Sequence, residues 1–272
     1  MKKSQIIILV IGIVSIIVLY SLPRVVVDND EGNMEIRAEA DEAGTDAAEL
    51  HDADISESVR NKISSLSQRM SIEEDKGKIS SLADSLAAEY TQAGKFDSAA
   101  YYLEQAALKL DNAELWEKTG TAYYEAYTFA LNEQKIAYLA DKTRSYLNKV
   151  LDKDPTRLDL KTKVAMTYVS SNNPMQGITM LREILEIDPN NEDGLFNMGV
   201  LSMQSGQYKR AAERFEELVR FHPDNLQGQF YLAVSYFESK QNNKAKKQFQ
   251  DVKNMTQDPM VLASVESYLE RL

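Results

Sequence analysis

The chain has 272 residues, of which 43% are hydrophobic, with 6 prolines, 11 glycines and no cysteine. The lack of cysteine excludes disulfides, thiolate metal sites and cysteine catalysis, and the few prolines and glycines favour helices over a sheet protein with many turns. The formal net charge of −11 argues against nucleic-acid binding, because phosphates require clustered lysine and arginine.

The N-terminal segment begins with Met-Lys-Lys-Ser-Gln at residues 1–5 and continues as an uncharged apolar run from Ile6 to Leu22. A helix over residues 6–22 would be about 25 Å long, which is the lower limit for crossing a bilayer. No small-residue cleavage site follows, so a transmembrane signal anchor is favoured over a cleaved signal peptide. The positive charges of Lys2 and Lys3 predict a cytoplasmic N-terminus, and hence a single-pass protein of the inner membrane with the rest of the chain on the exported, periplasmic side.

Residues 23–53 are rich in Ala, Asp, Glu and Gly. Twelve acidic residues and three arginines lie between Pro23 and Arg60, so the negative charge of the chain is concentrated there. Such a segment buries too little apolar surface to fold alone, and its charges repel one another. The sequence therefore predicts an acidic flexible linker at 23–53, with an acidic partner-binding segment as the alternative.

Apolar residues recur at helical spacing from residue 54 to residue 272. The first stripe runs from Ile55 to Met70 in steps of three and four residues, and it predicts an amphipathic helix near 54–70. No later segment alternates with a period of two for long enough to indicate a sheet. The expected fold over 54–272 is therefore all-α.

A period of 34 residues organises this helical region, as shown by the spacing of Pro155, Pro189 and Pro223. Small residues recur where two helices of one hairpin would touch, and large apolar residues recur where one hairpin would meet the next. The small residues are Ala165, Gly177, Gly199, Ala211, Ala233 and Ala245, and the large ones are Leu181, Phe215 and Phe249. Each period is therefore expected to form one helical hairpin.

This pattern resembles the tetratricopeptide repeat. That repeat is a helix–turn–helix unit of 34 residues with the sequence pattern W-x2-L-G-x2-Y, A-x3-F and P. Trp116, Gly120 and Tyr123 match the first-helix positions most clearly. The resemblance implies repeats at about 80–112, 113–157, 158–191, 192–225 and 226–259, followed by a C-terminal capping helix at 260–272. The unit at 113–157 is about 11 residues longer than the others, so we expect both of its helices to be extended.

The resemblance, together with the apolar run at 6–22, implies a membrane-anchored bacterial protein with a tetratricopeptide-type solenoid and one transmembrane helix. In this family the first helix of each hairpin lines a concave groove. The residues that this implies for the last three units form an apolar row, namely Met166, Val169, Phe196, Val200, Met203, Phe230, Val234 and Phe237. The row predicts a groove for a partner peptide or helix. The alternative is that the groove is filled from within, by helix 260–272 or by a second copy.

The sequence contains no catalytic, cofactor-binding or metal-binding motif. Its two histidines, His51 and His222, are expected to be exposed, and Trp116 and Tyr123 are expected in the repeat core rather than in a ligand cage. The predicted function is a non-catalytic scaffold or adaptor, tethered to the membrane, that binds a protein or peptide and uses no cofactor. The alternatives are a self-assembling structural component and a regulatory subunit of a membrane complex for assembly or translocation.

Overall fold

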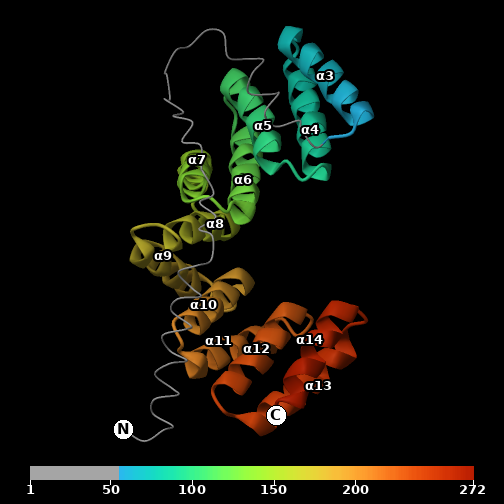
Figure 1. Cartoon of the computed structure of the whole chain (residues 1–272). Helices are drawn as coiled ribbons and strands as arrows, with labels where there is room; N and C mark the ends of the chain where they lie inside the picture. The colour runs from blue at the N-terminus through green and yellow to red at the C-terminus, as the bar shows by residue number, and fades with distance from the viewer. Residues whose placement is uncertain (1–54) are drawn as a thin grey trace, which may run out of the picture. The chain divides into compact units, whose positions relative to one another are not determined.

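The computed structural model describes residues 55–272, and these fall within one unit, Ala48–Leu272. Twelve helices and no strand occur among them, so the described part of the chain is all-α, as predicted (Figure 1). In chain order the helices are α3 (Glu57–Ile72), α4 (Lys76–Gln92), α5 (Phe96–Leu110), α6 (Ala113–Phe129), α7 (Glu133–Leu151), α8 (Leu158–Val169), α9 (Pro174–Ile187), α10 (Glu192–Gln204), α11 (Tyr208–Phe221), α12 (Leu226–Glu238), α13 (Asn242–Met255) and α14 (Pro259–Glu270).

Each helix packs against the one that follows it, so the described helices form a stack of hairpins (Figure 1). The pairs are α4–α5, α6–α7, α8–α9, α10–α11 and α12–α13, with α3 against α4 and α14 against α13. First helices also meet across hairpins, as α6 meets α8, α8 meets α10 and α10 meets α12. This nearest-neighbour packing is the architecture of a helical solenoid.

Side-chain caps set the beginning of several first helices. Asn112, Asn191 and Asn225 each accept a hydrogen bond from the backbone N–H three residues later, at the starts of α6, α10 and α12. These bonds satisfy a donor that the first helical turn would otherwise leave unpaired. Repeated capping at the same place in successive hairpins fixes where each unit begins.

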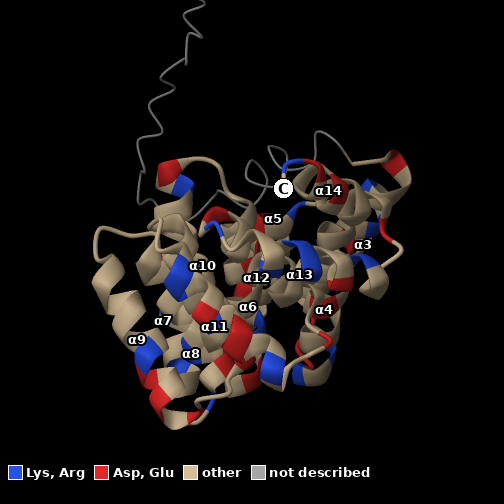
Figure 2. Ribbon diagram, turned by 90° about the horizontal axis from the view of Figure 1, so that it is seen from below, with Lys and Arg blue, Asp and Glu red and all other residues tan. Residues whose placement is uncertain are grey.

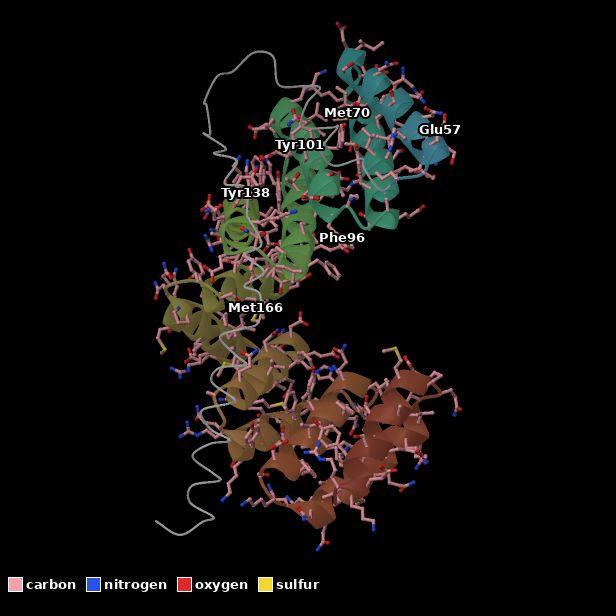
Figure 3. All side chains as sticks on the ribbon, in the orientation of Figure 1. Glu57, Met70, Phe96, Tyr101, Tyr138 and Met166 are labelled. Carbon is pink, nitrogen blue, oxygen red and sulfur yellow. The ribbon has the colours of Figure 1, made fainter. Side chains whose placement is uncertain are left out.

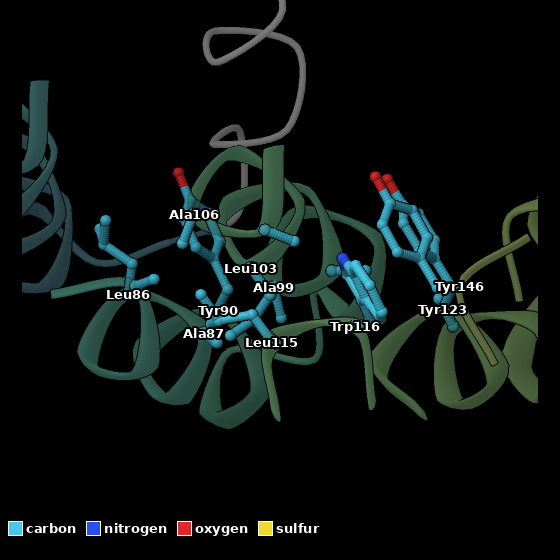
Figure 4. Packing of buried hydrophobic residues seen from close by; sticks show 14 of the residues in the cluster. Leu86, Ala87, Tyr90, Ala99, Leu103, Ala106, Leu115, Trp116, Tyr123 and Tyr146 are labelled. Atoms are coloured by element: carbon cyan, nitrogen blue, oxygen red, sulfur yellow. The ribbon is translucent and has the colours of Figure 1, made fainter. Parts of the chain in front are cut away.

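The small residues predicted at helix contacts are buried where helices approach closely. A Cβ atom on Gly177 would lie 2.3 Å from the carbonyl oxygen of Ala165, and one on Gly199 would lie 2.6 Å from the ring of Phe215. The residue that requires a glycine at 199 is therefore Phe215. Trp116 and Tyr123 are also buried, which confirms their place in the core (Figure 4).

The unit that was expected to be extended contains long helices. α6 has 17 residues and α7 has 19, whereas each helix from α8 to α14 has 12 to 14. The added length lies at the α6–α7 turn and leaves Leu131 97% exposed.

Several predictions concern residues outside the described part. The apolar run at 6–22, the linker at 23–53 and His51 all belong to this group. Between residues 55 and 272, no helix has the length and hydropathy needed to span a bilayer. His222 is half-buried rather than fully exposed, because its Nε2 atom lies 2.7 Å from the carbonyl oxygen of Asn190 in the preceding turn.

Candidate protein-binding groove

An open groove of about 680 Å³ lies between α4 and α6, and residues of α5 also line it. This volume falls in the range of about 300–1,000 Å³ that is typical of binding clefts. Ala99 and Leu103 of α5 are almost fully buried and form its base, and they are seen beside Ala87 in Figure 4. The groove is therefore built on one hairpin and the first helix of the next.

Short side chains keep the groove open. Ala87 and Ala88 line it from α4, and Ala122 lines it from α6. Ala88 is exposed, Ala122 is half-buried and Ala87 is buried. Because alanine has no atom beyond Cβ, these positions leave space between the two first helices, and a partner backbone can approach them closely.

Lys118 joins the two walls of the groove. Its Nζ atom lies 2.8 Å from Oδ2 of Asp84 on α4 and 2.9 Å from Oε1 of Glu114 on α6. The hydrogen bond to Asp84, strengthened by that to Glu114, raises the pKa of the Lys118 ammonium group. One ammonium group therefore forms ion pairs with two carboxylates. Acidic residues on α4 are red in Figure 2.

A second basic group neutralises the next carboxylate along α6. Arg157, just before α8, donates two hydrogen bonds to Glu117, at 2.8 and 2.6 Å, and it also binds Asp159. The bidentate contact from Arg157 holds the pKa of Glu117 below its usual range. Glu117 therefore fixes α6 to the following hairpin and contributes little free charge to the groove.

Glu125 is the last carboxylate that lines the groove. Its side chain is exposed and has no ion-pair partner among residues 55–272. Four carboxylates thus line the groove, and Lys118 and Arg157 are the two basic groups that contact them. Two carboxylates remain in excess, so the groove is acidic.

An exposed aromatic side chain, that of Phe129, lies beyond Glu125, one helical turn further along α6. The ring of Phe129 stacks on that of Phe96 with centroids 4.4 Å apart, and 62% of Phe129 remains exposed. Figure 3 labels Phe96 at the start of α5. Leu131 adds a second exposed apolar side chain directly after α6.

A buried polar cluster holds α5, α6 and α7 together behind the groove. The carboxylate of Glu104 accepts hydrogen bonds from the hydroxyl groups of Tyr123 and Tyr146, at 2.7 and 2.8 Å, and from Lys142 at 2.7 Å. Burial opposes the ionisation of Glu104, but these bonds, led by that from Lys142, outweigh it and lower the pKa of Glu104. The base and one wall of the groove are thus fixed by a fully satisfied network; the two tyrosines are labelled in Figure 4.

The apolar row predicted on the last three units is only partly accessible. Val234 is buried, and the other seven residues, Met166, Val169, Phe196, Val200, Met203, Phe230 and Phe237, are half-buried. Phe230 and Phe237 contact Tyr268 of α14, with ring centroids 6.1 and 5.2 Å apart. The structure thus places Tyr268 of the terminal helix against two residues of this row.

The residues of the α4–α6 groove were missed at the sequence level. Many of them occupy first-helix positions in the units that start at residues 80 and 113. The predicted apolar row used the same positions, but only in the three later units. At those positions the earlier units carry Asp84, Ala88, Thr91, Gln92, Glu114, Glu117, Thr121 and Glu125. Small and acidic residues resemble an ordinary solvated helix surface, so an apolar criterion overlooks them. Applying the positional rule to all five units would have found them.

No group of three or more His, Cys, Asp or Glu side chains between residues 55 and 272 is arranged to hold a metal ion. Two of the carboxylates with a lowered pKa, Glu104 and Glu117, are hydrogen-bonded by basic side chains.

Comparisons with known proteins support the same fold. The family model of the tetratricopeptide repeat matches residues 202–265. No curated protein matches the chain. A tetratricopeptide repeat protein from Parabacteroides merdae is similar in structure, with a TM-score of 0.57 and 17% identity over 78% of this chain and 79% of that one.

A thermophilic tetratricopeptide repeat protein from Thermus thermophilus is also similar, with a TM-score of 0.52 and 14% identity over 69% of this chain and 97% of that one. At these identities the likeness concerns the fold. Together with the hairpin stack and the matched repeat model, it shows that the described residues form a tetratricopeptide-type helical solenoid.

Proposed function

We propose that this protein is a non-catalytic interaction scaffold, and that the groove between α4 and α6 binds a segment of a partner protein. The open groove itself carries this proposal, because it is lined at first-helix positions by small and polar side chains. The Glu104 network holds α5 and α6, which form its base and one wall. A site that is already ordered loses little conformational entropy on binding, which favours affinity.

The proposal includes a tether to the membrane. The apolar run at 6–22 is the anchor, and residues 23–53 are an acidic spacer between it and the solenoid. These 31 residues reach at most roughly 110 Å when fully extended, at about 3.3–3.6 Å per residue. The positive flank of the anchor supports a solenoid on the periplasmic side of the inner membrane, where it would recruit a partner near the bilayer.

The groove is tested by site-specific photocrosslinking of the full-length chain in native membranes. A photoreactive residue replaces Thr121 in the groove, and a matched control carries it at Thr179, an exposed position of α9. We expect a defined protein adduct from position 121 but not from position 179. Adding Ala88→Trp, which fills the groove from the opposite wall, should abolish the adduct.

An adduct that forms equally from both positions, or that survives Ala88→Trp, would contradict binding in this groove. The mass of the adduct separates the candidate partners: a second copy of this chain would indicate self-assembly, and a different protein would indicate a heterologous complex.

The tether and its orientation are tested separately. Protease added to intact spheroplasts should digest the chain beyond Pro23, and deletion of residues 6–22 should release the protein from the membrane fraction. A solenoid that stays protected until the membrane is lysed would overturn the exported orientation.

A further inference from the structure

We propose that the segment bound between α4 and α6 is a cationic amphipathic segment of the partner. Its basic side chains lie against Glu125 and against Asp84 and Glu114, the two carboxylates that share Lys118. Its apolar side chain lies on Phe129 and Leu131. This inference rests on the proposed function, because it specifies the chemistry of the occupant of the same groove.

Charge complementarity is the first argument. The groove keeps two more carboxylates than its two basic groups can neutralise, and Glu125 has no ion-pair partner in the described part of the chain. A concave surface with one sign of charge concentrates the field and attracts the opposite charge. A lysine or arginine of the partner that contacts Glu125 would form an ion pair without displacing one that already exists.

The arrangement of side chains along α6 is the second argument. Glu114, Lys118, Glu125 and Phe129 are separated by steps of four, seven and four residues, so they lie along one side of the helix. The distance along the axis from Glu114 to Phe129 is about 22 Å at 1.5 Å per residue. A segment of about 14 helical residues covers this distance.

The third argument is the exposed apolar site at the end of this line. Phe129 is 62% exposed although its ring stacks on Phe96, and Leu131 is 97% exposed. Burying an exposed apolar side chain against a partner removes its surface from water, which favours binding. An amphipathic segment satisfies both ends of the surface, with charge along the groove and an apolar anchor at Phe129.

The same charges exclude two other occupants. An acidic peptide would meet the surplus carboxylates, and Lys118 and Arg157 already bind two carboxylates each. The acidic segment at 23–53 of this chain carries the same sign of charge as the groove, which disfavours this segment as the occupant. The groove is therefore kept available for a basic partner.

Peptide binding tests the inference directly. The full-length chain is held in non-ionic detergent and titrated against a fluorescent peptide of about 14 residues, with lysines along one side and a leucine at one end of that same side. A matched peptide carries glutamate in place of every lysine. Because residues 23–53 can attract any cationic peptide, the comparison is made between variants that share this segment.

Two charge reversals provide that comparison. Glu125→Lys changes the groove, and Glu213→Lys makes the same change at an exposed position of α11. We expect Glu125→Lys to weaken binding of the lysine peptide about tenfold or more and Glu213→Lys to change it less than about twofold. Leu131→Ser should weaken it to a smaller degree, and the glutamate peptide should not bind.

The possible outcomes separate this inference from the proposed function. Equal effects of the two reversals, or equal binding of the two peptides, would overturn the cationic partner. If Ala88→Trp still abolishes the photocrosslink in membranes, the groove remains the binding site and only its assigned chemistry is wrong. Circular dichroism melts confirm that each variant is folded, so a loss of binding cannot be attributed to unfolding.

Discussion

The two ends of the described solenoid use the same repeat position in opposite ways. In α4 and α6 the inner positions carry alanine, threonine and acidic residues, and an open groove lies between the helices. In α10 and α12 the corresponding positions carry Phe196, Val200, Phe230 and Val234, and their side chains are buried or half-buried. A repeat specifies where a groove can form, and the size of a few side chains decides whether it stays open.

The aromatic residues of the C-terminal hairpins contact one another across helices. Phe196 packs edge-on against Tyr231 of the next hairpin at 5.7 Å, and Phe230 does the same with Tyr268 at 6.1 Å. The N-terminal groove has no such residues between its walls, and Lys118 joins them by ion pairs instead. The C-terminal face is thus packed with aromatic side chains, whereas the N-terminal face keeps an open groove.

The largest expected difference in stability comes from adding a larger side chain at a tightly packed position and at a position in the open groove. Gly199→Leu would drive a side chain into the ring of Phe215, which a Cβ atom alone would approach to 2.6 Å. We expect a loss of about 3 kcal/mol or more in unfolding free energy. Ala88→Leu projects into the open groove instead and should cost less than about 0.5 kcal/mol. Denaturant titration of both variants checks the difference, and equal losses would mean that the groove is not open.

A smaller effect is expected from removing a side chain at one repeat position in each region. Phe230 on α12 and Asp84 on α4 occupy equivalent positions. Phe230→Ala removes contacts with Tyr231, Phe249 and Tyr268, so we expect a cost of about 2 kcal/mol, below the value for a fully buried phenylalanine. Asp84→Ala breaks only an exposed ion pair and should cost less than about 1 kcal/mol. Similar melting temperatures for the two variants would argue that the aromatic row is not part of the core.

The smallest expected difference in unfolding free energy is between substitutions in two tyrosine–glutamate hydrogen-bonded pairs, one buried and one exposed. Tyr123 donates to buried Glu104, and Tyr236 donates to exposed Glu216. Glu104→Gln should cost about 1.5 kcal/mol, because charge-assisted bonds in a buried site are lost. Glu216→Gln should cost about 0.5 kcal/mol or less, because solvent screens that pair.

The cost of Glu104→Gln should also depend on pH. The pKa of Glu104 is lowered in the folded protein, so its ionised form stabilises the fold above the unfolded pKa of about 4.3. This contribution is present at pH 7 and is lost as the pH falls through the lowered folded pKa. Unfolding free energies measured across this range should converge for the wild type and Glu104→Gln in acid. A difference that stays constant with pH would show that the charge of Glu104 is not responsible.

Much of the fold follows from the sequence because the repeat depends on local spacing. Gly177, Gly199 and Phe215 could be placed at helix contacts from the 34-residue period alone, and the structure confirms that they are tightly packed. The fold class is set by helix periodicity, which the sequence shows directly.

The candidate site was harder to predict, because it depends on which inner positions are covered by other helices. Phe230 and Phe237 look like binding residues in the sequence, but Tyr268 reaches them from a helix about 30 residues away. Ala88 and Glu125 look like ordinary surface residues, yet they line the groove. Exposure of this kind is a property of packing between hairpins, and no single helix reveals it.

The most direct test of this account places one photoreactive residue at equivalent positions of the two regions, Ala88 on α4 and Val200 on α10. Both variants are expressed as the full-length chain and irradiated in native membranes. An open N-terminal groove and a filled C-terminal face predict a partner adduct from position 88 and none from position 200. An adduct from position 200 without one from position 88 would contradict the account. It would indicate that the partner binds the apolar row of the last three repeats instead.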